Sequence, residues 1–251
     1  MDKKEKSNWR LAEERCPDEC RNESKLIFLR CEVFRVKLAV NRYIQYWDKR
    51  LELFGPDKAF LPILGLGPNG VMKDNQKELQ FGYSRCPPPD TCQDPDGRAI
   101  LFLDGTKLDA ARNNPDITQE GLIRASWYHC HFALLSESAQ RKGIVCVYKC
   151  MKMYGSISKS PLQSVSASLK GTLPIRVAAF HIMEPPHLIS ILLKFARTFI
   201  GKTMQKRIYV HNFGSREKNF ESLSKYGIGR KQLPKELGGD FVFEKVELGN
   251  H

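Results

Sequence analysis

No stretch of this sequence is apolar for long enough to cross a bilayer. The longest candidate, residues 188–193, contains Ser190 and falls far short of the roughly 20 apolar residues that a spanning helix needs. The first residues are charged on both signs and lead into no apolar segment of signal-peptide length. We therefore expect a cytoplasmic protein without a membrane-spanning segment.

Sequence motifs of common enzyme classes are also missing. There is no G-x-S-x-G elbow, no Walker loop and no H-E-x-x-H helix, and no pair of carboxylates stands out in the basic half of the chain. Cys16 and Cys20, like Cys86 and Cys92, lack the second half of a zinc-finger pattern. We therefore predict that the chain is not an enzyme and carries no metal and no cofactor.

Two patterns that look like ligand sites have simpler explanations. His129 and His131 are two residues apart on a predicted helix, so they point to different faces and cannot hold one metal ion together. The run GLGPNG at residues 65–70 matches G-x-G-x-x-G, but no amphipathic helix or second strand follows it. A plain turn is the simpler interpretation, and an NAD-dependent enzyme is an alternative that nucleotide titration would test.

The chain is large enough to fold without covalent cross-links. With 251 residues, of which 41% are hydrophobic, it can bury a full core without disulfides or a metal. The eight cysteines are expected to be reduced in the absence of an export signal, and Cys130, Cys146 and Cys150 fall within apolar patterns. We predict that these three are core residues.

Positive charge is in excess, and it is concentrated in one region. Residues 141–218 contain 14 basic residues and 2 acidic ones, Glu184 and Glu217, and the difference of +12 equals the net charge of the whole chain. A region of one sign favours phosphate-rich partners, either nucleic acid or an anionic membrane surface.

Three parts follow one another along the chain. We expect a small helical subdomain at residues 1–60, a linker rich in loops at 61–97 and an α/β domain at 98–251. The main helix of the first part ends at Gly55 and Pro56. Its predicted apolar face comprises Val40, Tyr43, Ile44, Trp47, Leu51 and Phe54.

Strand and helix patterns alternate in the third part. Short apolar runs predict strands at residues 99–103, 144–148, 175–182 and 207–210. Helices are predicted after the cap Thr118, from Pro186 to residue 200, and over residues 220–226. This order predicts an α/β fold with a mixed, mostly parallel sheet and flanking helices.

Several spaced segments form a recognisable set. They are LPIRVAAFHIMEP at 173–185, the helix at 186–200 with its wide apolar face, KRIYVH at 206–211 and LPKELGG at 233–239. In this order they resemble the CRAL-TRIO lipid-binding domain family, and KLIFLRCEVFRVKLA at 25–39 resembles the small helical subdomain that precedes the domain. The resemblance covers about residues 25–240. It implies a hydrophobic pocket over a mixed sheet, closed by a gate helix at residues 186–200.

The resemblance also implies which residues form the site. The lipid-pocket positions are Ser126, Cys130, Ile144, Tyr148 and Phe180, together with Leu188, Leu192, Phe195 and Phe199 on the gate helix. Phosphoinositide-responsive members bind lipid phosphates with a basic cluster beside the gate helix. The matching positions here are Arg176 and Arg207, with Lys202 and Lys206 nearby. The chain departs from the family pattern at Lys149, Pro174, Ala178 and Met183.

From this resemblance we expect a monomeric cytosolic protein that binds a hydrophobic lipid ligand and carries it between membranes. Its basic half would dock transiently on anionic membranes, including membranes that contain phosphoinositides. The alternative is a nucleic-acid-binding protein that uses the same basic half, although neither an RRM signature nor zinc spacing supports it.

Overall fold

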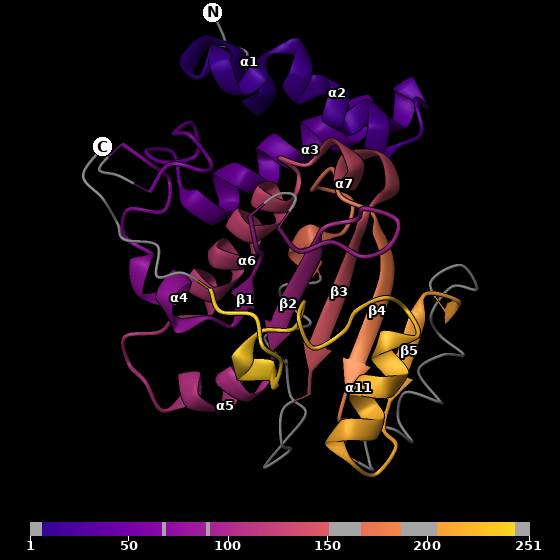
Figure 1. Ribbon diagram of the computed structural model, residues 1–251. Coiled ribbons are helices and arrows are strands. Elements are labelled where there is room, and N and C mark those ends of the chain that lie inside the picture. The colour runs from indigo at the N-terminus through magenta and orange to yellow at the C-terminus, as the bar shows by residue number, and fades with distance from the viewer. Residues whose placement is uncertain (1–6, 67–68, 89–90, 151–166, 187–204, 244–251) are drawn as a thin grey trace, which may run out of the picture.

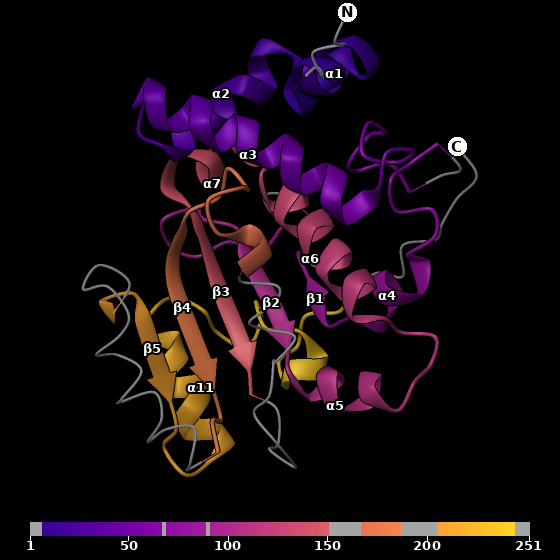
Figure 2. The same ribbon diagram turned by 180° about the vertical axis from the view of Figure 1, so that it is seen from behind.

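The computed structural model describes residues 7–66, 69–88, 91–150, 167–186 and 205–243 (Figure 1). Within these residues, N-terminal helices lie at one end of a five-stranded sheet, and further helices cover its two faces (Figures 1 and 2). The predicted α/β fold with a mixed, mostly parallel sheet is therefore confirmed. The gate helix expected at residues 186–200 lies outside the described residues, apart from Pro186.

The N-terminal part of the chain is helical. Its elements are α1 (Asn8–Arg15), the 3₁₀-helix η1 (Pro17–Cys20), α2 (Asn22–Cys31) and α3 (Val36–Phe54). Helix α3 ends where the sequence predicts, because Gly55 follows it with a φ of 74°, a conformation that residues with a side chain rarely adopt.

The buried face of α3 is rotated from the predicted one. Its buried residues are Ala39, Tyr46, Trp47, Arg50, Leu53 and Phe54. Val40, which the periodicity places on the buried face, is 52% exposed, so this part of the prediction is wrong. The first turns of α3 lie at the rim of the helical layer (Figure 1). At such a rim, apolar residues at helical spacing do not all have a neighbouring element to pack against.

A chain of hydrogen bonds joins α3 to α6 (Gln119–Ala133). The Nδ1 atom of His131 lies 2.8 Å from the Trp127 carbonyl oxygen and donates its proton there, so Nε2 accepts the 3.0 Å hydrogen bond from the Tyr46 hydroxyl. Tyr46 in turn accepts a 3.0 Å hydrogen bond from the fully buried Arg50. Its ring stacks on Trp127 with centroids 5.6 Å apart, which fixes the helical layer on α6.

The sheet consists of β1 (Ser84–Arg85), β2 (Ile100–Asp104), β3 (Ile144–Lys149), β4 (Val177–Met183) and β5 (Ile208–His211). The strands lie side by side in chain order, with β1 antiparallel to β2 and the other neighbours parallel. The four predicted strands are present with their ends shifted by one or two residues. The edge strand β1 was not predicted, because a strand of two residues is too short to show an alternation of apolar and polar side chains.

The stretch at residues 61–97, predicted as a linker, contains regular structure. It holds β1 and the short helix α4 (Gln76–Phe81). Glu78 of α4 accepts a 3.0 Å hydrogen bond from the hydroxyl of Thr118, and Thr118 caps α6 as predicted by accepting from the backbone N–H of Gly121. This stretch is therefore packed against the sheet domain.

Alternate residues of the central strands point to opposite faces of the sheet. On one face α6 packs through Leu122, Trp127 and Cys130. On the other face α11 (Arg216–Ser224) packs through Phe220 and Leu223, followed along the chain by the 3₁₀-helix η2 (Lys235–Leu237). Figure 2 shows α6 on the near side of the sheet and α11 on the far side. Helices α5 (Thr106–Arg112) and α7 (Glu137–Lys142) lie at opposite ends of the sheet (Figure 1).

The predicted helix at residues 220–226 begins four residues earlier than expected. Ser215 caps its N-terminus, because its hydroxyl accepts a hydrogen bond from the backbone N–H of Lys218. The sequence signal for this cap was present, since serine is among the preferred N-cap residues.

Candidate functional site

Three neighbouring parallel strands place apolar side chains on the face of the sheet that α6 partly covers. We call this set of side chains the apolar wall. It comprises Ile144, Cys146 and Tyr148 of β3, Phe180 and Ile182 of β4, and Ile208 and Val210 of β5. The register places Cys146 opposite Phe180 and Phe180 opposite Ile208, so the wall runs without interruption across all three strands.

The apolar wall is buried at one side and half-buried at the other. Ile144 and Tyr148 are at most 5% exposed, and they belong to the core cluster that includes α6. Phe180, Ile208 and Val210 are half-buried and pack against that cluster from the β5 side. The aromatic rings of Tyr148 and Phe180 lie 6.3 Å apart, so these two predicted pocket residues are brought together.

The two predicted pocket residues on α6 are buried within the core. The hydroxyl of Ser126 donates a 2.8 Å hydrogen bond to the Leu122 carbonyl of its own helix, which leaves no donor for a ligand. Burial raises the pKa of the Cys130 thiol to about 12, so the thiol stays protonated and behaves as a small apolar group. Cys146 and Cys150 are buried as well, as predicted for core cysteines.

Five predicted site residues lie outside the described residues: the pocket residues Leu188, Leu192, Phe195 and Phe199, and the head-group residue Lys202.

The predicted head-group arginines lie at the same edge of the sheet. Arg176 directly precedes β4 and Arg207 directly precedes β5, and these strands are parallel neighbours whose register pairs Ile208 with Phe180. The side chain of Arg207 reaches back from there to the first residue of β4. One Nη atom of Arg207 donates a 2.9 Å hydrogen bond to the Val177 carbonyl, and Arg176 donates to the Arg141 carbonyl. Lys206, next to Arg207 in the chain, is exposed.

More cations than the predicted ones gather at this edge, which we call the basic edge. It comprises Arg141 and Lys142 in the last turn of α7, together with Arg176, Lys206 and Arg207. The nearby carboxylate of Glu137 is already bound by Arg141 at 2.7 Å and by Arg30 at 2.8 Å, which lowers its pKa. Arg141 is thus paired, whereas the other four cations of the edge form no ion pair with a described residue, so the edge keeps a positive charge.

Tyr83 is a residue of the site region that the sequence did not reveal. It is fully buried in the same core cluster as Tyr148, and its hydroxyl has no hydrogen-bond partner in the structure as described. Burial and the neighbouring Tyr148 raise its pKa. Tyr83 lies at the end of the loop-rich stretch before β1, where no periodicity tells which way a side chain points.

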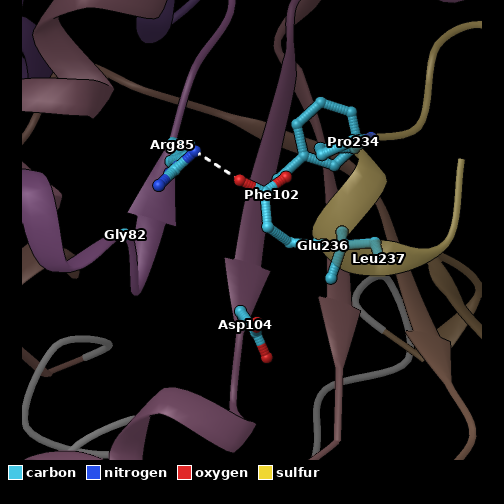
Figure 3. Close-up of a pocket in the computed structure, with 7 residues that line it drawn as sticks. All are labelled: Gly82, Arg85, Phe102, Asp104, Pro234, Glu236 and Leu237. Atoms are coloured by element: carbon cyan, nitrogen blue, oxygen red, sulfur yellow. Dashed lines mark hydrogen bonds and ion pairs between the residues drawn. The ribbon is translucent and has the colours of Figure 1, made fainter. Parts of the chain in front are cut away.

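Two cavities lined by described residues lie away from the apolar wall. One, of about 270 Å³, opens on the opposite face of the sheet and is lined by polar groups that include Asp94, His181 and Tyr226. The other, of about 10 Å³, has room for about one water molecule. Figure 3 shows it beside the 2.7 Å ion pair between Arg85 and Glu236. The first is too polar and the second too small for a lipid chain.

The described residues give no support to the rival ligand sites. His129 contacts Ser84 of β1, whereas His131 contacts Tyr46 of α3, so the two imidazoles face different neighbours as predicted. No group of three or more His, Cys, Asp or Glu in the described part of the chain is arranged to hold a metal ion. Gly65 and Gly70 pack directly against each other, and α4 begins only at Gln76, so the glycine run does not lead straight into a helix as it does in a dinucleotide-binding turn.

Over the residues that the structure describes, no helix is both long and apolar enough to span a membrane.

Comparison with known proteins identifies the family. The model of the CRAL/TRIO domain matches residues 91–239, which is more than half of the chain. No curated protein matches. Among solved structures, the chain is similar to the crystal structure of Sfh5, with a TM-score of 0.49 and 13% sequence identity over 75% of this chain. The match spans 64% of the length of that structure. The chain therefore belongs to the CRAL/TRIO family, whose members are generally lipid-binding and lipid-transfer proteins.

Proposed function

We propose that this protein binds one hydrophobic lipid against the apolar wall and carries it between membranes, docking on anionic membranes through the basic edge. The observation that carries the proposal is the apolar wall itself. Seven side chains on three strands form it, and none of them is charged. Its outer part, at Phe180 of β4 and at Ile208 and Val210 of the edge strand β5, is half-buried, which leaves apolar surface for a lipid chain.

The energetics of lipid transfer favour a closed site. At ~0.8 kcal/mol for each buried CH₂ group, a chain of 16 carbons gains about 13 kcal/mol on leaving water. The lipid must therefore be shielded during transit. Exchange between a bilayer and an apolar pocket is nearly neutral, since both surroundings are apolar. Contacts with the head group then decide which lipid is retained. The gate expected at residues 186–200 would provide the closure.

The basic edge supports docking on a phosphate-rich surface. Arg176 and Arg207 occupy positions that match the phosphate-binding cluster of phosphoinositide-responsive relatives, and guanidinium groups can bind phosphate in a bidentate manner. Positive charge alone would suit nucleic acid equally well. The apolar wall supports a lipid, because its two aromatic residues, Tyr148 and Phe180, lie within a continuous apolar face and Tyr148 is buried, whereas nucleic-acid bases stack on exposed aromatic rings.

The test is lipid loading measured by native mass spectrometry and lipid extraction after purification. In Phe180→Asp a carboxylate would replace a ring of the apolar wall whose centroid lies 6.3 Å from that of Tyr148. A charge in a dry site is strongly disfavoured, so we expect at least a tenfold loss of bound lipid.

The matched control is Phe213→Asp. Phe213 is 53% exposed in the loop between β5 and α11, away from the wall, and this variant should load lipid like the parent. Melting temperatures of both variants show whether the fold is retained. A folded Phe180→Asp protein that extracts the same lipid in the same amount as the parent would refute the site.

A further inference from the structure

The connection between α2 and α3 exposes an unusual concentration of apolar side chains. Among the nine large hydrophobic residues that are exposed in the described chain, five lie within the eight residues 33–40. They are Val33, Phe34, Val36, Leu38 and Val40, each between 43% and 63% exposed. We call residues 33–40 the apolar tip. Soluble proteins rarely expose such a cluster unless it has a binding role.

The backbone of the apolar tip holds these side chains outward at an energetic cost. The N–H of Phe34 bonds to the Leu29 carbonyl at 2.7 Å and the N–H of Val33 to the Arg30 carbonyl at 3.2 Å, which is the Schellman pattern of a helix C-terminus. The residue in the left-handed position of this pattern is usually glycine. Here it is Val33 with a φ of 52°, followed by Phe34 with a φ of 58°. A β-branched residue in this region is strained.

Cations alternate with the apolar residues of the tip. Arg35 has a side chain that is 66% exposed, and Lys37 is exposed as well. The carboxylate of Glu32 beside the tip is nearly buried, and it is bound by Arg42 at 2.6 Å and by Arg35 at 3.6 Å. Because Arg42 is already its closer partner, Arg35 and the exposed Lys37 leave the tip with positive charge.

The apolar tip lies at the same end of the sheet as the basic edge. Arg42 also donates a 2.8 Å hydrogen bond to the carbonyl of Leu173, just ahead of β4, and Arg30 of α2 bonds to Glu137 of α7. Figure 1 shows α7 and the connection between α2 and α3 together at the amino ends of the strands. Tip and edge thus present apolar and cationic groups at one end of the molecule.

We propose that the apolar tip inserts into the interfacial region of an anionic membrane while the basic edge rests on the lipid head groups. This deepens the proposed function, on which it rests, because a transfer protein must meet the membrane from which it takes lipid. Insertion of apolar side chains flanked by Lys and Arg is the general mode of interfacial binding.

The arrangement of the tip fits a bilayer better than a protein partner. Val36 and Val40 lie on one side of α3, whereas Leu38 lies about 160° away around the helix, and Val33 and Phe34 belong to the preceding turn. A groove on a protein would contact one face of this tip. A bilayer can contact all the exposed sides of the tip at once, leaving only the side of the buried Ala39 on the protein, and can hold the interspersed Arg35 and Lys37 at the level of the phosphates.

The test is co-sedimentation with vesicles of phosphatidylcholine alone or with about a quarter phosphatidylserine. We expect the parent chain to bind the anionic vesicles preferentially and Phe34→Ser to weaken that binding about tenfold, as expected for a large side chain lost from an apolar environment. Phe213→Ser, which changes an equally exposed phenylalanine at the other end of β5, should bind like the parent.

Two further variants separate insertion from a structural role. Val33→Gly removes an apolar group and relieves the left-handed strain, so it should weaken vesicle binding while raising the melting temperature by about 2–4 °C. A residue with a purely structural role would not move these two quantities in opposite directions. Phe34→Trp should retain binding, and its emission should be quenched by brominated phospholipid more than that of the parent.

Vesicle binding that is unchanged in Phe34→Ser, or absent in the parent, would overturn the proposal. The proposal would also be overturned if the parent self-associates and Phe34→Ser abolishes that self-association without changing vesicle binding. The tip would then be a contact surface for a second copy of the chain. A parent that binds vesicles through the tip but extracts no lipid would leave the tip in place and refute the proposed function instead.

Discussion

Acid should destabilise this protein well above the pH at which carboxylates are protonated, because four of its six histidines are held in the neutral form. The pKa of His129, His131, His181 and His211 is lowered in each case from 6.5 to about 4, and burial is the largest cause. For His131, the Nε2 acceptor site is also occupied by the Tyr46 hydroxyl, so a second proton would displace an existing hydrogen bond.

The sign and size of the effect follow from proton binding. Between pH 6.5 and 4 the unfolded chain binds protons at these histidines and the folded chain does not, so stability falls as pH decreases through this window. A fall of the pKa from 6.5 to about 4 corresponds to at most about 3 kcal/mol for each histidine. Domains are typically stable by about 5–15 kcal/mol. Most of the stability is therefore expected to be lost before pH 4.

Urea unfolding at a series of pH values measures this directly. Near pH 5.5 each of the four histidines should bind close to one more proton in the unfolded state, so the free energy of unfolding should change by about 5 kcal/mol per pH unit. His131→Phe should reduce that slope by about a quarter, whatever it does to the stability at neutral pH. A slope below about 1.4 kcal/mol per pH unit, or one that His131→Phe leaves unchanged, would refute the assignment.

Three other predictions concern charge. Vesicle binding should weaken as salt is raised from low to physiological concentration, because each surface cation contributes about 1 kcal/mol against anionic lipid and is screened; binding that is flat with salt would contradict a role for the basic edge. In a transfer assay with phosphoinositide-containing acceptor vesicles, Arg207→Lys should slow transfer more than Lys218→Gln, since the planar guanidinium fork matters beyond its charge, and the reverse ranking would reduce the basic edge to a diffuse patch. Glu19→Gln should cost about 3–5 kcal/mol in urea unfolding, because it leaves the fully buried Arg50 without its anion at 3.0 Å, and a loss below about 1 kcal/mol would contradict this.

Local sequence patterns identified the elements whose signals are complete within a short window. The helix after Thr118 was predicted because a capping residue precedes a long helical apolar pattern, and its hydrogen bond to the backbone of Gly121 is present. The central strands were predicted because a strand buried on both faces reads as an uninterrupted apolar run. The short strand β1 was missed because it is formed by pairing with β2 and by no pattern of its own.

The burial of a residue could not be predicted from the sequence where it depends on partners that are distant in the chain. Arg50 looks like a surface residue of an amphipathic helix, yet it is fully buried, because Glu19, Tyr46 and the carbonyl of Leu61 accept hydrogen bonds from its two Nη atoms. Val40 looks like a core residue of the same helix, yet it is exposed, because it lies on a side of α3 that the described residues leave uncovered, next to the buried Ala39.

By itself the sequence determined the class of fold, the concentration of positive charge and the family resemblance, since these depend on periodicity, composition and ordered motifs. Only the tertiary structure decided which residues meet. Arg176 and Arg207, 31 positions apart in the chain, share one edge because β4 and β5 are parallel neighbours in the sheet. The apolar tip joins that edge because Arg42 and Arg30 tie the N-terminal helices to the beginning of β4 and to α7. These spatial neighbours depend on the order of the strands and on helix packing, and short-range patterns in a sequence do not specify either.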